Sequence, residues 1–76
     1  MNLTAAQRQA LGHIAVGRIR MRNTGYGSWR ILGPSHPGVV GRVVSLGLAM
    51  WETAGPREKV AALTPAGLAL VREVAE

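Results

Sequence analysis

The chain has 76 residues, with nine Lys and Arg, four acidic residues and no Cys, and its formal net charge is +5. This length predicts one domain, which buries only about 60% of the surface of its unfolded chain. The absence of Cys excludes disulfides and thiolate metal sites, so we expect a small basic domain of modest stability without a cofactor.

A helix is expected from Thr4 to Gly17. Thr4 is a good N-cap, Gln7 completes a capping box, and Gly17 is placed to end the helix. Gly12 lies inside this helix, where it is less favourable than Ala by about 1 kcal/mol. The expected buried stripe consists of Ala10, Leu11, Ile14 and Ala15.

The segment from Arg18 to Pro37 is expected to be extended. Its glycines at 25, 27 and 33 and its prolines at 34 and 37 oppose a regular helix. Residues 18–22 alternate polar and apolar side chains, and residues 28–32 are also typical of a strand. We predict a hairpin or an irregular extended segment, in which any helix is reduced to a turn around residues 34–37.

This segment interleaves Arg20, Arg22 and Arg30 with Tyr26 and Trp29. Guanidinium groups bind phosphates or enter a narrow minor groove, and an exposed ring can stack on an unpaired base. We expect Trp29 to fill the core, whereas Tyr26, in a Gly-Tyr-Gly loop, is a candidate contact residue.

Residues 35–48 predict a short second helix. Ser35 is the expected N-cap, Pro37 is tolerated in the first turn, and Gly47 permits a sharp exit. The apolar residues recur at steps of three and four and share one face, formed by Val40, Val43, Val44 and Leu48.

The solvent face of this second helix is expected to carry Val39, Arg42 and Ser45. Arg42 could read a guanine edge, and the helix start with Ser35 and His36 could hold a phosphate. The alternative for Arg42 is a charge that only keeps the surface soluble.

Residues 49–53 and 60–63 predict two strands joined by a turn at Gly55-Pro56, with Trp51 packed under them. The tip offers two cations, Arg57 and Lys59, against Glu58, for a contact with the DNA backbone or minor groove.

The last helix begins with Thr64 as its cap and Pro65 at its first position. Leu70 adds a flank to its apolar face, which either completes the core or forms a homodimer. That face consists of Leu68, Val71, Val74 and Ala75.

Two short motifs carry a resemblance to a known family. The residues Val40, Arg42, Val43 and Val44, followed by LGLA at 46–49, resemble the recognition-helix exit of small winged helix-turn-helix regulators. The sequence LTPAGL at 63–68 resembles the L-T-x-x-G signature that closes the wing and opens the last helix. Regulators of the multiple-antibiotic-resistance and PadR types show both elements. The resemblance implies an α+β winged helix that binds double-stranded DNA.

The distribution of charge favours the same role. All four acidic residues lie in the second half of the chain, whereas the first 37 residues contain five Arg and no acid. A field of one sign attracts polyanions, nucleic acid above all, although a merely solvated basic face is the alternative. The candidate nucleic-acid contacts are Arg18, Arg20, Arg22, Tyr26, Arg30, Ser35, His36, Arg42, Ser45, Arg57 and Lys59.

The interpretation is a small transcriptional regulator of the phage or mobile-element kind. The alternative is a protein-interaction module, such as a phage-type inhibitor or assembly factor, that docks its basic hairpin on an acidic partner.

An enzyme is not expected. The Glu residues show no paired spacing, and His13 and His36 lack further metal ligands. Nothing in the sequence supports a catalytic Ser-His-Glu triad formed by Ser28 or Ser35 with His36 and Glu52. The sequence also lacks a phosphate-binding loop. The chain does not open with a basic start and an apolar block, and its longest uncharged run, 60–71, is too short to span a membrane. We therefore expect a cytoplasmic protein.

Overall fold

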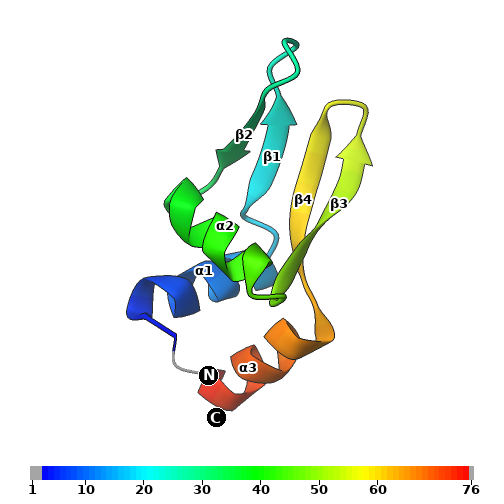
Figure 1. Ribbon diagram of the computed structural model, residues 1–76. Coiled ribbons are helices and arrows are strands. Elements are labelled where there is room, and N and C mark those ends of the chain that lie inside the picture. The colour runs from blue at the N-terminus through cyan, green and yellow to red at the C-terminus, as the bar shows by residue number, and fades with distance from the viewer. Residues whose placement is uncertain (1–2, 76) are drawn as a thin grey trace.

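The computed structural model describes residues 3–75, and side chains to residue 72. Within that range the chain forms three helices and one four-stranded antiparallel sheet (Figure 1), which confirms the α+β class. The elements are α1 (Ala5–Ala15), β1 (Arg20–Asn23), β2 (Trp29–Leu32), α2 (Pro37–Ser45), β3 (Ala49–Gly55), β4 (Glu58–Leu63) and α3 (Pro65–Ala75). The predicted hairpin at residues 49–63 is present, and of the two alternatives for the segment after α1 the structure has the hairpin, formed by β1 and β2.

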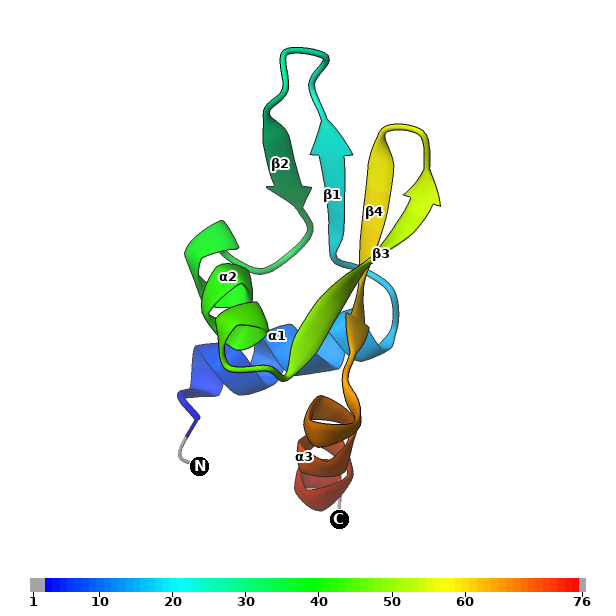
Figure 2. The ribbon, with the colours of Figure 1, turned by 45° about the vertical axis from the view of Figure 1, so that its right-hand side comes forward.

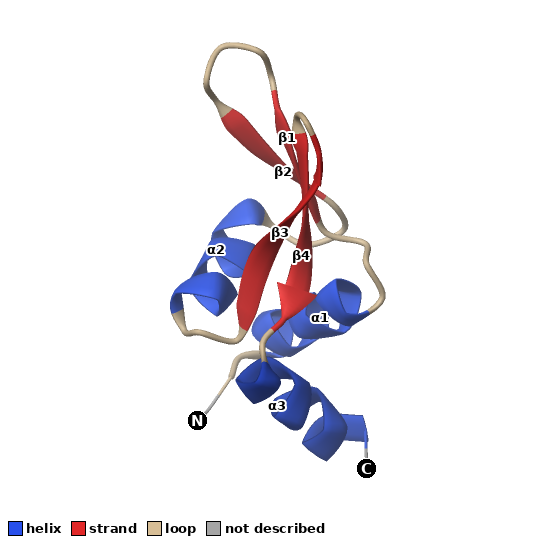
Figure 3. Ribbon diagram, turned by 90° about the vertical axis from the view of Figure 1, so that its right-hand side faces the viewer, coloured by secondary structure: helices blue, strands red, loops and turns tan. Residues whose placement is uncertain are grey.

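The sheet has the strand order β2-β1-β4-β3, so pairing of β1 with β4 joins the two hairpins side by side. Figures 1 and 2 show both hairpins extending beyond the helices, and Figure 3 shows the helices gathered around the other end of the sheet. The molecule is accordingly elongated, with extents of 41 × 19 × 18 Å. None of the helices within residues 3–75 is long and apolar enough to cross a bilayer.

The core lies where the helices meet the lower end of the sheet. Ile19, Ala49 and Ala61 are buried, and Trp51, directly opposite Ala61, is half-buried against them as expected. The side of the sheet that carries Ala49, Trp51 and Ala61 faces the helices. Apart from Leu48, the other buried apolar side chains all come from α1 and α2. Those helix residues are Ala10, Leu11, Ile14, Val40 and Val43.

The two motifs that carry the family resemblance contact each other. The Thr64 hydroxyl donates to the carbonyl of Gly47 at 2.6 Å and accepts from the Gly67 N–H at 3.2 Å. The Thr64 N–H donates to the Leu48 carbonyl at 3.1 Å. Thr64 is therefore the cap of α3, as predicted, and it also bonds the start of α3 to the exit of α2.

Helix α1 begins as predicted, but its buried stripe is narrower than the predicted one. Thr4 and Gln7 form the capping box, with reciprocal backbone-to-side-chain bonds of 3.0 and 3.1 Å. Gly17, at φ 75°, follows the helix end. The expectation that Ala15 is buried is wrong, because it lies in the last turn at the margin of the stripe and is exposed.

Replacing Gly12 with Ala is expected to raise the free energy of unfolding by about 1 kcal/mol, since Gly disfavours a helix interior. Gly12 is exposed, and a Cβ there would meet nothing within 4 Å. Urea denaturation measures the change. The control, Gly17→Ala, should destabilise, because the φ of Gly17 is 75°. A Gly12→Ala protein no more stable than the wild type would contradict this expectation.

Helix α2 differs from the prediction at both ends. Its N-cap is His36 rather than Ser35, because the His36 Nδ1 accepts the Gly38 N–H at 3.0 Å and Pro37 takes the first helical position. Leu48 lies beyond the helix end at Ser45, and the turn at Gly47, with φ 79°, returns it to the core.

Two apolar residues of the helices lie on faces other than those expected. Val39 of α2 is half-buried against the core rather than in solvent. Leu68 of α3 is 42% exposed, because Leu70 and Val71 are the α3 side chains that pack against the core. Val74 and Ala75 lie outside the described side chains. The homodimer through α3 stays a prediction, for which Leu68 supplies exposed apolar surface.

Candidate nucleic-acid interface

Three of the predicted contact residues project from one side of the sheet. Arg22 lies directly opposite Arg30 of β2 and Glu58 of β4, and Arg20 lies opposite Leu32 and Val60. Directly paired residues, and residues two apart on a strand, share a face. We call this side, opposite to the core, the outer face. All three arginines are exposed on it.

The charges of the outer face are only partly compensated. The Nη2 of Arg22 lies 3.1 Å from the Oε1 of Glu58, and the two side chains are 62% and 34% exposed. Among the side chains that the structure describes, this is the one ion pair, so Glu58 pairs with β1 rather than with Arg57 or Lys59. An exposed pair of this kind contributes little and is easily exchanged for another partner.

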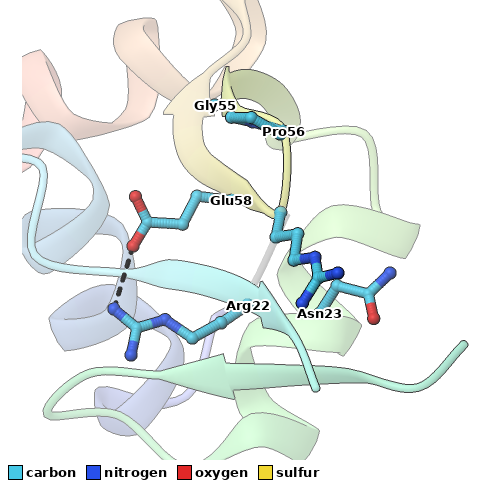
Figure 4. Close-up of a pocket in the computed structure, with 6 residues that line it drawn as sticks. Arg22, Asn23, Gly55, Pro56 and Glu58 are labelled. Atoms are coloured by element: carbon cyan, nitrogen blue, oxygen red, sulfur yellow. Dashed lines mark hydrogen bonds and ion pairs between the residues drawn. The ribbon is translucent and has the colours of Figure 1, made fainter. Parts of the chain in front are cut away.

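The tips of the two hairpins are joined. The Asn23 N–H donates to the Arg57 carbonyl at 2.9 Å, and the Arg57 Nη1 lies 3.8 Å from where a Cβ on Gly25 would be. Figure 4 shows the surface hollow at this junction, with Arg22 reaching across to Glu58. The hollow is lined by Arg22, Asn23, Gly55, Pro56, Arg57 and Glu58.

The loop between β1 and β2 is held by its own hydrogen bonds. The Thr24 N–H donates to the Ser28 carbonyl at 2.9 Å, and the Gly25 N–H donates to the Asn23 Oδ1 at 2.9 Å. Gly25 and Gly27 have φ values of 95° and 78°, which residues other than glycine rarely adopt. Tyr26 stands between them and is 93% exposed.

Asn23 was not among the residues that the sequence singled out. Its backbone joins the hairpin tips and its side chain closes the loop. The local signal was an Asn two residues before a Gly, a pattern typical of an Asx turn. The bond to Arg57 had no local signal, because it depends on the pairing of β1 with β4.

Comparison with protein-family models, with curated proteins and with solved structures found no significant match to this chain. A functional interpretation must therefore rest on the residues and geometry of this chain.

The side of the sheet opposite to the outer face carries an aromatic residue beyond the helices. The Nζ of Lys59 lies 4.9 Å from the ring centroid of Trp29, a cation–π contact. Trp29 is 39% exposed, so the expectation that it fills the core is wrong. The reason is its place at the start of β2, on the part of the sheet that extends past the helices (Figure 1).

The remaining candidate residues are not gathered with the outer-face arginines. Arg42 and Ser45 are exposed on α2, which lies at the helical end of the sheet. The Nδ1 of His36 is engaged as the cap of α2, and Ser35 is half-buried. Arg18 is exposed just before β1.

Among the residues that the structure describes, no group of three or more His, Cys, Asp and Glu side chains could hold a metal ion. The chemistry of the outer face and the joined tips is that of exposed guanidinium groups, an exposed phenol ring and backbone donors. Such groups bind phosphate oxygens and bases.

Proposed function

We propose that this protein is a cytoplasmic DNA-binding module of the winged-helix kind, acting as a small transcriptional regulator of the phage or mobile-element type. The observation that carries the proposal is the exposure of Arg20, Arg22 and Arg30 on one face of a hairpin that extends past the helices. The DNA major groove admits a two-stranded ribbon, and arginines that neutralise phosphates supply most of the non-specific affinity.

The order of the elements supports the proposal. Helix α2 runs at once into the β3–β4 hairpin, with α1 before it and α3 after it, which is the plan of a winged helix-turn-helix. The chain departs from that plan between α1 and α2, where the β1–β2 hairpin stands in place of a helix. DNA contact by this hairpin, with Arg57 at the joined tip, is therefore the main feature of the proposal, and Arg42 and Ser45 of α2 add a second contact.

Binding to a random duplex of about 20 base pairs is expected to weaken about 100-fold between 50 and 200 mM salt. The estimate assumes about four arginine–phosphate contacts, each of which contributes a slope of about −0.9 to log K against log salt. Fluorescence anisotropy with an end-labelled duplex measures it. A duplex that the protein does not bind at 50 mM salt, or binds with an affinity insensitive to salt, would contradict the proposal.

A protein-interaction module is the second candidate. The outer face also carries apolar side chains, since Leu32, opposite Arg20, is 42% exposed, and Met50 of β3 is 46% exposed. A surface of basic and apolar groups fits an acidic protein partner. Absence of duplex binding in the titration above would favour this candidate.

A further inference from the structure

The tip of the β1–β2 hairpin presents an aromatic ring that packs on almost nothing in its own chain. Tyr26 is 93% exposed in the loop between β1 and β2, and this loop lies at the end of the sheet farthest from the helices (Figure 1). We propose that Tyr26 stacks on an unpaired or unstacked base, so that the preferred ligand is a DNA duplex interrupted by such a base. This inference rests on the proposed DNA-binding function and specifies the form of DNA that it recognises.

The ring is held at the tip by an ordered loop. The bonds from Thr24 to Ser28 and from Gly25 to Asn23 close the loop, and the Asn23–Arg57 bond fixes it to the second hairpin. A ring on an ordered loop loses little conformational freedom on binding, which favours affinity. The two flanking glycines, with positive φ, turn the chain on either side of Tyr26.

Three cations lie on or next to the hairpin that carries the ring. The Arg57 guanidinium lies beside Gly25, and Arg22 and Arg30 project from the strands that carry the loop. An aromatic ring flanked by cations is the combination that binds unpaired nucleic acid, where the ring stacks on a base and the cations bind the backbone.

The ring is poorly suited to a regular duplex. Both faces of a paired base are covered by its neighbours, so an inserted ring must first separate two stacked bases at a cost of free energy. An unpaired base has already lost part of that stacking, and a protein that stacks on it avoids the cost. The arginines bind the phosphates of a paired duplex and of an interrupted duplex alike. A preference for the interrupted duplex therefore comes from Tyr26.

The test uses the full chain and two end-labelled duplexes of the same sequence, one fully paired and one with a central bulge of two adenines. Anisotropy titrations should show the wild type binding the bulged duplex about tenfold more tightly, the lower range of aromatic–base stacking. Tyr26→Ala should reduce this ratio to about one, because it weakens binding to the bulged duplex more than binding to the paired one. Tyr26→Phe, which keeps the ring, should retain the ratio. A bulge containing 2-aminopurine should lose fluorescence on binding the wild type and not on binding Tyr26→Ala.

The two proposals fail in different ways. Equal binding of both duplexes by the wild type, or an undiminished ratio in Tyr26→Ala, would overturn the role of Tyr26 and leave the DNA-binding function in place. Failure to bind either duplex would overturn both. Because the side chain is 93% exposed, loss of the fold does not explain an effect of Tyr26→Ala, and circular dichroism checks this.

Discussion

Replacing Gly67 with Ala is expected to lower the free energy of unfolding by about 3 kcal/mol. Gly67 is buried in the first turn of α3, where a Cβ would lie 2.9 Å from the carbonyl carbon of Leu48 and closer still to its oxygen. The helix cannot easily move away, because Thr64 bonds its start to Gly47 and Leu48. Overpacking against backbone costs about 3 kcal/mol or more. That is most of the stability of a small domain near the lower limit of about 5 kcal/mol.

Urea denaturation followed by circular dichroism measures this loss. The matched control is Gly41→Ala, the same change in the exposed part of α2, where a Cβ would meet nothing within 4 Å. That variant should be at least as stable as the wild type, because Ala favours the helix. A Gly67→Ala protein with the stability of the wild type would show that α3 does not pack on Leu48 in this way.

The double substitution Arg20→Ala and Arg30→Ala is expected to weaken binding to a paired duplex about 30-fold or more at low salt. Each arginine supplies a charge-assisted contact of about 1 kcal/mol or more. Neither has an ion-pair partner among the described side chains, so their removal leaves no buried charge uncompensated. Arg22 is kept, since its loss would also release Glu58 and add a repulsive charge.

The matched control removes the same net charge from the helices, by Arg8→Ala and Arg72→Ala. Both residues are exposed on helices, away from the outer face. Anisotropy with the same duplex should show a loss of affinity of only about threefold for this control, because distant charges act through a screened field. Equal losses in the two variants would mean that overall charge, and not the hairpin, determines the binding.

Local patterns in the sequence predicted the elements well. The capping box of Thr4 and Gln7, the alternation of residues 18–22 and the turn at Gly55-Pro56 are local signals, and each marks an element of the structure. The extended segment predicted between the first helix and residue 37 followed from its glycines and prolines, which act through the backbone of their own segment.

The expectations that were wrong depended on how the elements pack. A strand pattern gives no indication that the sheet extends past the helices, and so Trp29 is exposed rather than buried. Helical spacing placed Leu68 on the packed face, but the close approach at Gly67 turns Leu70 and Val71 toward the core. The gathering of Arg57 with the β1–β2 loop depended on pairing between distant strands.

The contact between the two motifs gives a physical reason for their joint occurrence in this chain. Gly47 leaves α2 with φ 79°, which exposes its own carbonyl and that of Leu48 to the start of α3. Thr64 bonds to both carbonyls, and Gly67 has no side chain to obstruct the approach. The motifs are therefore two sides of one packing contact, which is a structural role and does not by itself indicate DNA binding.

The most direct test of the central claim, that the arginines of the outer face bind DNA phosphates, is the salt dependence of duplex binding by two proteins. The wild type and the Arg20→Ala/Arg30→Ala variant are titrated with one paired duplex over a series of salt concentrations. We expect the slope of log K against log salt to be less steep by about two for the variant, about 0.9 for each phosphate that it no longer neutralises. Parallel lines for the two proteins would contradict the claim.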